Sequence, residues 1–358
     1  MKKIKIATVY ISRRIEKFEP VTMDTIRWLR ISEGLAKKGY QVDMIINEAK
    51  PKIIEMSPNL RRVPYSKINW QDYDVIKTLF HEGFRSLEKT GGSNHPFIIC
   101  KTPVVDPKSQ VDANLKPWSK WYLLWIQGRI NQKAKLITVL NQRNKIIWER
   151  EYGKKNNILI IPTGVDKVIP QPQKNPYQKI GGKIVLFAGF ICGLELRKVN
   201  IFWQERLNNL GKMLYQKGIH LCFVGSGLTD KLEQKYVHCF EPVPNEKFWN
   251  YQYFADCGIV LADAPDVHNE SSKIYYYLRT GLPVVSESPI PNNYLIQKSK
   301  LGFISPFDNN EKMTDLIVRA VNKKWNKKYA IDYILKNHTW DQRVDIYNKL
   351  IRKHFKVI

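Results

Sequence analysis

The sequence predicts an α/β protein made of two Rossmann-like domains, each with a doubly wound parallel sheet. Short apolar, β-branched runs alternate with amphipathic helix patterns along the whole chain, which is typical of parallel sheets covered by helices. The 358 residues correspond to about two domains of roughly 150 residues each. A polar stretch rich in Pro, Gln and Lys, Val168–Gly182, interrupts the alternation and has the composition of a linker.

The first half opens with a βαβ pattern. Ile4–Tyr10 is apolar and β-branched, as in a buried strand, and a helix pattern runs from about Thr22 to Lys38. Gly39 is placed to end that helix, and Gln41–Asn47 reads as a second, parallel strand. The further elements expected in this half are strands Asp74–Phe80 and Pro96–Cys100, helix Lys116–Lys133, and strands Leu136–Leu140 and Ile158–Ile161.

A second series of elements follows the linker and repeats the same alternation. The expected strands are Lys183–Phe190, Ile219–Val224, Val237–Phe240, Gly258–Ala262 and Pro283–Ser286. The expected helices are Asn200–Lys217, Asn245–Phe254, Ser271–Arg279, Asn292–Lys298, Asn309–Lys323 and Thr339–Phe355. Open parallel sheets bind ligands at the carboxyl ends of their strands, so two such domains predict a ligand cleft between those edges.

Composition excludes a disordered chain, because 43% of the residues are hydrophobic and 12% aromatic. Lys and Arg number 58 against 33 Asp and Glu, a formal net charge of +25. Nucleic acid, an anionic membrane and phosphate-bearing small molecules are the partner classes that such a charge favours. We do not expect nucleic acid, because the lysines are spread over the whole chain without a nucleic-acid-binding motif.

Cysteine usage and the apolar segments bear on location. No two of the five cysteines have a CxxC spacing, which argues against a zinc site or a disulfide framework and fits a reducing compartment. The start lacks an apolar segment of signal-peptide length. The longest apolar stretch, Ile184–Leu194, is far shorter than the ~20 residues that span a bilayer. We expect a cytoplasmic protein, with a peripheral position on the inner face of the membrane left open.

Three features of the second half would face the same edge of its sheet. Gly225-Ser226-Gly227 follows a strand, where backbone without side chains can approach a phosphate, although a simple turn explains it equally well. Ser271 or Ser272 can cap a helix whose free N–H groups would bind an anion.

Lys273 in that first turn is unfavourable for the helix dipole, so a bound phosphate would explain it. The alternative is a solvated lysine. Gly281-Leu282-Pro283 ends the helix and leads into a buried strand, where the glycine serves as a cap in either interpretation.

The run from Ser272 to Val285 resembles the nucleotide-sugar motif of GT-B glycosyltransferases, especially the large retaining family 4. Three other segments are similar to the same family in the same order. They are the interdomain segment Ile160–Asp166, the base-binding stretch Val237–Asp256, and Thr339-Trp340-Asp341 before the last helix.

The resemblance implies a GT-B fold with an N-terminal acceptor domain at 1–166, a linker at 167–182, and a C-terminal nucleotide-sugar domain at 183–338. A helix at 339–358 would cross back to the N-terminal domain. The donor would lie against Gly225, Gly227, Phe240, Glu241, Val243, Glu270, Ser272, Lys273 and Tyr276. No resident cofactor is expected, because the nucleoside-diphosphate sugar is itself a substrate. No metal is expected, because no DxD pair is placed at a strand end as a metal clamp.

The chain departs from the family pattern at several positions. Family members usually carry two glutamates around the phosphate loop, where this chain has His268 and Tyr276. Glu270 or Glu241 would have to replace the glutamate that holds the ribose. The family's Gly-Arg pair reads Gly189-Phe190 here, so Lys198 or Arg197 would supply charge to the phosphates, and Arg13 and Arg14 stand where a glycine pair is expected in the first domain.

Acid–base candidates come from the first half. A base is needed to deprotonate an acceptor hydroxyl in an inverting reaction. Asp106 and His81 follow predicted strands and would face the cleft, while a loop carboxylate and a surface imidazole are the structural alternatives. Asp263 and Asp266 have the wrong spacing for a metal clamp, and we interpret them as loop residues.

One helix carries a tryptophan stripe. Trp118, Trp121 and Trp125 fall at i, i+3 and i+7 among basic residues. We expect this stripe to pack against the sheet, as apolar stripes do in Rossmann domains. A membrane interface or a lipid-linked acceptor is the alternative occupant.

The sequence therefore predicts a glycosyltransferase that moves a sugar from a nucleoside diphosphate to a hydroxyl of a glycan or lipid-linked acceptor, in polysaccharide or glycoconjugate synthesis. Two alternatives stay open. A nucleotide-sugar epimerase of the same shape would need more cleft carboxylates and histidines than we can place. A non-catalytic nucleotide-sugar-binding scaffold is permitted by the missing glutamates.

Overall fold

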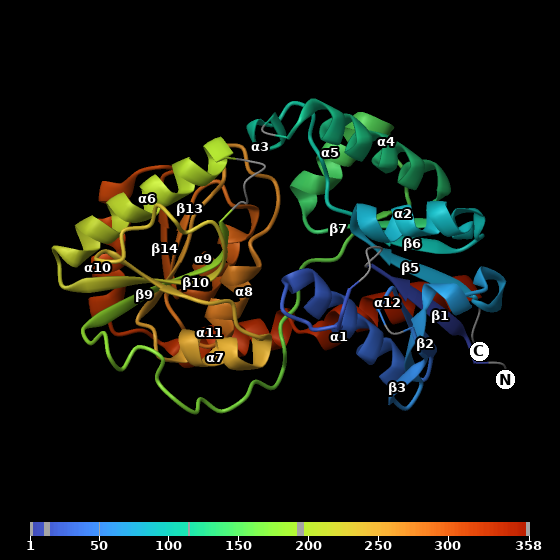
Figure 1. Ribbon diagram of the computed structural model, residues 1–358, viewed down its shortest axis with the longest axis horizontal. Helices are drawn as coiled ribbons and strands as arrows, with labels where there is room; N and C mark the ends of the chain where they lie inside the picture. Colours follow the sequence, from blue (N-terminus) through green and yellow to red (C-terminus); the bar gives the residue numbers. More distant parts are fainter. Residues whose placement is uncertain (1–2, 11–14, 50, 114, 192–196, 356–358) are drawn as a thin grey trace. The chain divides into compact units, whose positions relative to one another are not determined.

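The chain folds into two units, each built around its own sheet (Figure 1). The computed structural model describes residues 3–10, 15–49, 51–113, 115–191 and 197–355, without the side chains at 111, 113 and 197–201. The first unit comprises Met1–Lys108, Leu115–Gly164 and Trp340–Ile358, and the second comprises Ser109–Asn114 and Val165–Thr339.

The first unit contains an eight-stranded sheet in the order β3-β4-β2-β1-β5-β6-β7-β8. All neighbours pair in parallel except β3 and β4. The strands are β1 (Lys5–Val9), β2 (Gln41–Ile46), β3 (Ile54–Ser57), β4 (Leu60–Pro64), β5 (Val75–Leu79), β6 (Ile98–Lys101), β7 (Leu136–Val139) and β8 (Ile158–Ile160). The helices are α1 (Met23–Lys37), α2 (Phe80–Thr90), α4 (Pro117–Lys133), α5 (Gln142–Tyr152) and α12 (Trp340–Phe355).

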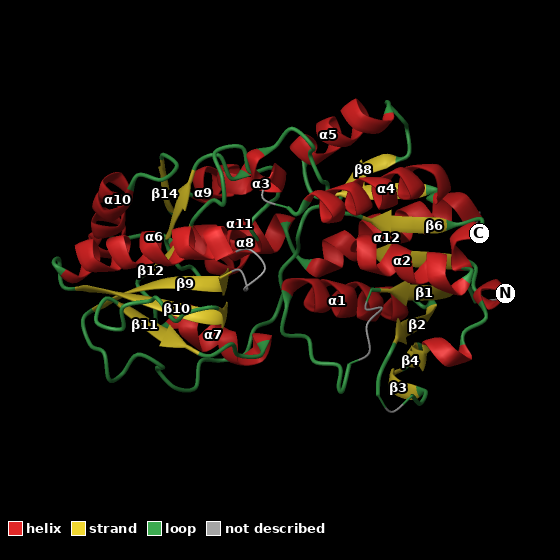
Figure 2. Ribbon diagram, turned by 45° about the horizontal axis from the view of Figure 1, so that its top comes forward, coloured by secondary structure: helices red, strands yellow, loops and turns green. Residues whose placement is uncertain are grey.

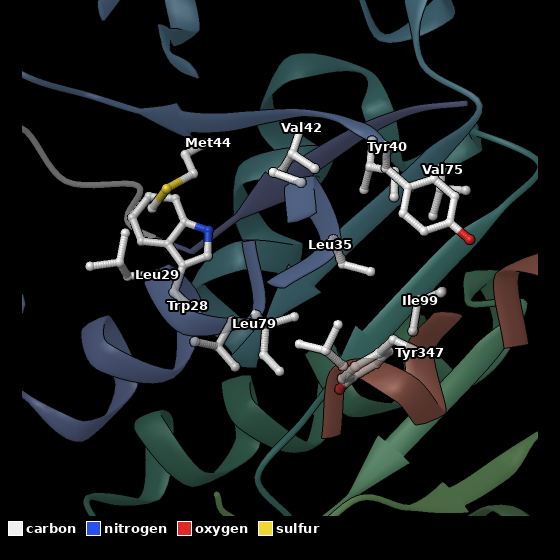
Figure 3. Close-up of a cluster of buried hydrophobic side chains, with 14 of the residues drawn as sticks. Trp28, Leu29, Leu35, Tyr40, Val42, Met44, Val75, Leu79, Ile99 and Tyr347 are labelled. Atoms are coloured by element: carbon white, nitrogen blue, oxygen red, sulfur yellow. The ribbon is translucent and has the colours of Figure 1, made fainter. Parts of the chain in front are cut away.

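Two helices from opposite ends of the chain complete one core of the first unit. Figure 3 shows Trp28 and Leu35 of α1 and Tyr347 of α12 among strand residues such as Val42 and Ile99. The two helices touch directly, because a Cβ on Gly34 would collide with Val344. The C-terminal helix therefore belongs to the N-terminal unit. Helices α2, α4 and α5 contribute to the second core cluster of this unit.

The second unit contains a six-stranded parallel sheet in the order β11-β10-β9-β12-β13-β14. Its strands are β9 (Lys183–Ile191), β10 (Ile219–Gly227), β11 (Val237–Phe240), β12 (Cys257–Val260), β13 (Val284–Glu287) and β14 (Gly302–Ser305). Its helices are α3 (Gln110–Ala113), α6 (Arg197–Tyr215), α7 (Asn245–Tyr253), α8 (Ser272–Arg279), α9 (Tyr294–Ser299), α10 (Asn310–Asn322) and α11 (Lys327–Asn337). Figure 2 shows helices alongside the strands of each sheet. This strand order is that of a doubly wound sheet, so the predicted fold class is confirmed.

Several elements were not expected from the sequence. Strands β3, β4 and β14 have only four or five residues and lie at or next to sheet edges, so they carry little periodic signal. Helix α2 begins at Phe80, immediately after β5 and without intervening turn residues. Phe80 has a φ of 58° there, and the expected strand Asp74–Phe80 extends one residue beyond the end of β5, into the first residue of α2.

The expectation that the tryptophans of helix α4 pack against the sheet is wrong. The helix buries Ile126, Gln127 and Ile130. Trp118 and Trp121 are each 68% exposed and Trp125 is 44% exposed. Successive helix residues turn by about 100°, so the isoleucines and the tryptophans occupy different sides of α4, and the smaller side chains fill the core.

Candidate functional site

The second unit has its topological switch point between β9 and β12. Strand order runs from β9 to β10 in one direction and from β9 to β12 in the other. In open α/β sheets, ligands bind outside the carboxyl ends of the strands at such a point. Gly189 lies near the carboxyl end of β9, and the segment after β12 leads into α8. These elements define the candidate site.

Lys273 and Gly189 meet at this switch point. A Cβ on Gly189 would lie 3.0 Å from Cε and 3.2 Å from Nζ of Lys273, and the glycine has a φ of +156°. The glycine therefore leaves the space in which the lysine lies against the strand. The ammonium group is also 5.5 Å from the centre of the Phe187 ring.

The ammonium group of Lys273 has no hydrogen-bond acceptor among the described residues, and its side chain is partly buried. Burial lowers the pKa of Lys273, and the carboxylate of Asp263 partly opposes that effect. A cation removed from water without a bonded acceptor is costly, and an anionic ligand would offset the cost.

The start of α8 presents backbone N–H groups beside this lysine. Ser271 is the N-cap, but its side chain does not cap the helix, and its buried Oγ has no hydrogen-bond partner among the described residues. Asn292 holds the Ser271 backbone at both ends, accepting from its N at 2.9 Å and donating to its O at 2.8 Å. Ser272 is the first helical residue, and no acidic residue follows in the first turn. This geometry suits an anion.

The segment between β12 and α8 also carries two polar pairs. Glu270 accepts a hydrogen bond from the Tyr275 hydroxyl at 3.0 Å. His268 is buried, and its Nε2 lies 3.6 Å from Oδ2 of Asp112. Asp112 comes from the short helix α3, which sequence reasoning did not single out. Asp112 and His268 are far apart in the sequence, so no local pattern indicated that they are in contact.

A buried ion pair stabilises the beginning of the same segment. Glu287 ends β13 and pairs with Arg206 of α6, and both side chains are almost fully buried. The carboxylate of Glu287 accepts hydrogen bonds from the N of Ala262 at 2.7 Å and the N of Asp308 at 2.8 Å. Burial raises the pKa of Glu287, and Arg206 opposes it. This network fixes the chain just beyond β12, and the sequence analysis missed it.

Gly225 and Gly227 lie within strand β10, and the expectation that they form a turn after the strand is wrong. They pair in register with Gly189 and Ile191 of β9. A Cβ at Gly225 would come within 1.8 Å of the Gly189 oxygen, and one at Gly227 within 1.7 Å of the Ile191 oxygen. The neighbouring strand occupies the space that the glycines leave, so close strand pairing explains them.

Aromatic packing accounts for two of the other expected donor residues. The Phe240 ring lies edge-on to Tyr177 and Tyr251, at 5.7 and 5.3 Å between ring centres. Tyr276 is 3% exposed, and its ring is stacked on Trp249 at 5.1 Å. These contacts place both rings in the packing between elements of the second unit.

The remaining expected donor residues are less constrained. Glu241 is exposed and Val243 is partly buried just beyond β11. Arg197 and Lys198 begin helix α6, but their side chains lie outside the described residues, so their phosphate role stays a prediction.

The two acid–base candidates of the first unit have different surroundings. His81 lies in the first turn of α2, is 6% exposed, and its Nε2 has no hydrogen-bond partner within the described part of the chain. Burial lowers the pKa of His81 to about 4, opposed by Gln127, so the imidazole is neutral and is not on the surface. Asp106 accepts hydrogen bonds from Arg150 at 2.6 Å and from the N of Lys108 at 2.9 Å. Asp106 is therefore an ion-paired carboxylate.

A cationic cluster near the carboxyl ends of β5 and β6 was not foreseen. Arg27 and Lys101 lie 5.8 and 5.5 Å from the ring centre of Phe80. Burial and the charge of Arg27 lower the pKa of Lys77 to about 7. Asp24 pairs with Arg27 at 3.1 Å, and burial raises the pKa of Asp24. Lysines inside the otherwise apolar strands Val75–Leu79 and Ile98–Lys101 are the signal that could have revealed this cluster.

No group of three or more His, Cys, Asp or Glu side chains within the described residues is arranged to hold a metal ion.

Comparison with known proteins identifies the fold. No family model matches the chain, and no curated protein sequence matches it. Among solved structures, sucrose-phosphate synthase from Thermosynechococcus elongatus is 13% identical with a TM-score of 0.71, covering 99% of this chain and 100% of that one. Anabaena HepE in complex with UDP is 12% identical with a TM-score of 0.68, covering 98% and 100%. WaaG, a glycosyltransferase involved in lipopolysaccharide biosynthesis, is 14% identical with a TM-score of 0.61, covering 96% and 95%. The chain therefore has the GT-B fold, as its sequence resemblance implied.

Proposed function

We propose that this protein is a glycosyltransferase that takes a sugar from a nucleoside-diphosphate sugar and attaches it to a hydroxyl group. The observation that carries the proposal is the partly buried Lys273, which lies against Gly189 at the switch point of the second unit. The structures similar to this chain include HepE with UDP, with UDP and glucose, and with UDP-glucose. They support a nucleotide-sugar donor here.

The chemistry matches the charges at this site. In the transfer, the bond between the sugar C1 and the β-phosphate oxygen breaks, and the acceptor oxygen forms the new bond to C1. The leaving diphosphate gains negative charge, while the acceptor hydroxyl loses its proton to a base. Lys273 and the N-terminus of α8 supply positive potential to the diphosphate. Fixed donors of this kind lower the barrier without a metal ion.

The acceptor is the less constrained part of the proposal. We place it on the first unit and infer a glycan or a lipid-linked sugar. Arg27, Lys77 and Lys101 are buried basic residues of this unit, and Asp24 pairs with Arg27 among them. Basic side chains of this kind are suited to an acceptor that carries a negative group.

Binding of the donor is the experiment that tests this proposal. The melting temperature of the purified protein is measured with uridine, guanosine and adenosine diphosphates, and with the matching nucleosides as controls. We expect one diphosphate to raise the melting temperature while its nucleoside does not, because the phosphates supply the contacts to Lys273 and α8. Absence of any shift with all diphosphates and their sugar conjugates would overturn the proposal.

Product analysis separates the alternatives. A transferase releases nucleoside diphosphate with a sugar acceptor present, and an epimerase converts one nucleotide sugar into another without an acceptor. A scaffold binds the donor and does neither. We favour the transferase because the structures similar to this chain include sucrose-phosphate synthase and WaaG, a glycosyltransferase involved in lipopolysaccharide biosynthesis.

A further inference from the structure

Helix α4 presents an apolar face that the described residues of the first unit leave exposed. Trp118, Trp121 and Trp125 are 68%, 68% and 44% exposed, while Ile126 and Ile130 of the same helix are fully buried. Isolated exposed apolar residues are common, but three tryptophans along one side of one helix form a contiguous apolar patch. Such patches mark sites of protein or membrane contact.

The charge around this face is one-sided. Between Ala113 and Trp148 the sequence contains no Asp or Glu. The same stretch contains seven basic residues, namely Lys116, Lys120, Arg129, Lys133, Lys135, Arg143 and Lys145. The stretch covers α4 and the beginning of α5, whose last turn carries Glu149 and Glu151. The two helices pack together through the Trp148–Asn131 hydrogen bond at 3.3 Å and lie side by side in Figure 1.

Neighbouring groups reduce this charge only in part. Arg129 pairs with Glu88 of α2 at 3.2 Å, and Lys145 pairs with Glu149 of α5 at 3.7 Å. Lys120 and Lys133 donate hydrogen bonds to neutral oxygens, those of Pro107 and Asn94, and so keep their full charge. Lys116, immediately before the helix, is exposed. Lys116, Lys120 and Lys133 therefore leave net positive charge on the helix that carries the tryptophans.

We propose that this face binds the surface of an anionic phospholipid bilayer. Tryptophan is enriched at membrane–water interfaces because its ring is apolar and its N–H is polar, and lysines beside it are attracted to anionic head groups. A protein partner would need acidic groups opposite the lysines and an apolar pocket shaped to the tryptophans. An anionic bilayer offers negative charge and an apolar layer without such specific geometry. No helix among the described residues is long and apolar enough to cross a membrane, so α4 would lie in the interface plane. This inference does not depend on the proposed sugar transfer.

Vesicle co-sedimentation tests the proposal with the full chain. One set of vesicles contains phosphatidylcholine alone, and the other contains phosphatidylcholine with phosphatidylglycerol. The wild-type protein is expected to sediment with the anionic vesicles at low salt and much less with the neutral ones. High salt should weaken but not abolish this binding, because salt screens the lysines and leaves the tryptophan contacts.

Variants locate the binding face. The double variant Trp118→Ala/Trp121→Ala should bind anionic vesicles at least about tenfold more weakly, since each ring can bury ~150–250 Å². Its melting temperature should equal that of the wild type, because both side chains are exposed. The matched control is Tyr253→Ala/Tyr329→Ala, which removes two aromatic rings that are 57% and 45% exposed in the second unit. That control should bind as the wild type does.

Three results would overturn the proposal. In the first, the wild-type protein stays in the supernatant when the anionic vesicles are sedimented at low salt. In the second, the tryptophan variant binds the anionic vesicles as tightly as the wild type does. In the third, analytical ultracentrifugation without lipid shows a dimer that the tryptophan variant loses, which makes a second copy of the chain the occupant of this face.

Discussion

Replacing Lys273 with Met distinguishes the effect of this lysine on the stability of the free protein from its effect on donor affinity. The change keeps a side chain of similar length against Gly189 and removes the charge. In the free protein, burial lowers the pKa of Lys273, so the folded state holds the charged form less readily than the unfolded chain does. We therefore expect the variant to be at least as stable as the wild type at pH 7.

The pH dependence of that difference has a definite sign. A lysine whose folded pKa lies below its unfolded value of 10.5 destabilises the folded state most strongly at low pH. The cost is relieved as pH rises from the folded pKa towards 10.5. Any stability advantage of Lys273→Met should accordingly shrink as the pH is raised into that range.

The effect on donor binding runs in the opposite direction. A hydrogen bond to a charged group contributes about 1.5–3 kcal/mol, which corresponds to a roughly 10–150-fold weaker affinity when it is lost. At a nucleotide concentration of about 100 times the wild-type Kd, the ligand stabilises the wild type by about 2.7 kcal/mol. A variant with about thirtyfold weaker affinity would gain only about 0.9 kcal/mol under the same conditions.

The assay is the melting temperature with and without the nucleoside diphosphate, followed by titration calorimetry. Lys298→Met is the matched control, because Lys298 is exposed on α9 of the same unit. The control should keep the full ligand shift. An unchanged Kd for Lys273→Met, or a loss of stability in the free variant that accounts for the missing shift, would refute the assignment of Lys273 to the diphosphate.

Three further predictions concern single substitutions elsewhere in the two units. Lys77→Met should stabilise the protein at pH 6, because burial lowers the pKa of Lys77 to about 7. The gain in stability, measured by chemical denaturation, should fade between pH 7 and 10.5. A gain that does not depend on pH would contradict this prediction. Glu287→Gln leaves the buried Arg206 with only the partly exposed Asp308, 2.9 Å away, as counter-charge, and should cost about 3 kcal/mol in the same assay. A loss below about 1 kcal/mol would show that the Arg206–Glu287 pair is dispensable. Gly225→Ala puts a Cβ 1.8 Å from the Gly189 oxygen and should lower the melting temperature; unchanged stability with lost nucleotide binding would instead favour the phosphate role.

The fold could be predicted well because its signal is local. Each strand of a parallel sheet covered on both faces is a short apolar run, and each crossover helix follows it in sequence. Lys273 was also accessible from sequence, since the helix start, the lysine and the following strand lie within one short segment. The elements that were missed were short or near sheet edges, or began without a turn, as α2 does at Phe80.

The rest of the site depends on contacts that sequence spacing does not encode. Asp112 contacts His268 because α3 belongs to the second unit. In the same unit, the backbone N–H of Gln110 donates a hydrogen bond to Asp266, which lies 156 residues later in the sequence. The glycine at 225 suggested an open phosphate loop, but a missing Cβ looks the same whether a ligand or a neighbouring strand fills the space.

The tryptophan stripe shows a comparable limit. Helical periodicity showed that Trp118, Trp121 and Trp125 share one side of α4, but not which side faces the sheet. Ile126 and Ile130 form a competing apolar stripe on the same helix, and they are the residues that pack in the core.

Release of nucleoside diphosphate from its sugar conjugate tests the central claim most directly. The donor selected by the melting-temperature experiment is incubated with the protein and a panel of sugar and lipid-linked sugar acceptors, and the free diphosphate and the glycosylated product are quantified by liquid chromatography. We predict diphosphate release that depends on one class of acceptor, in equal amounts with the new glycoside, and that is reduced in Lys273→Met at subsaturating donor. Tight donor binding with no release for any acceptor, or conversion of the nucleotide sugar without an acceptor, would contradict sugar transfer.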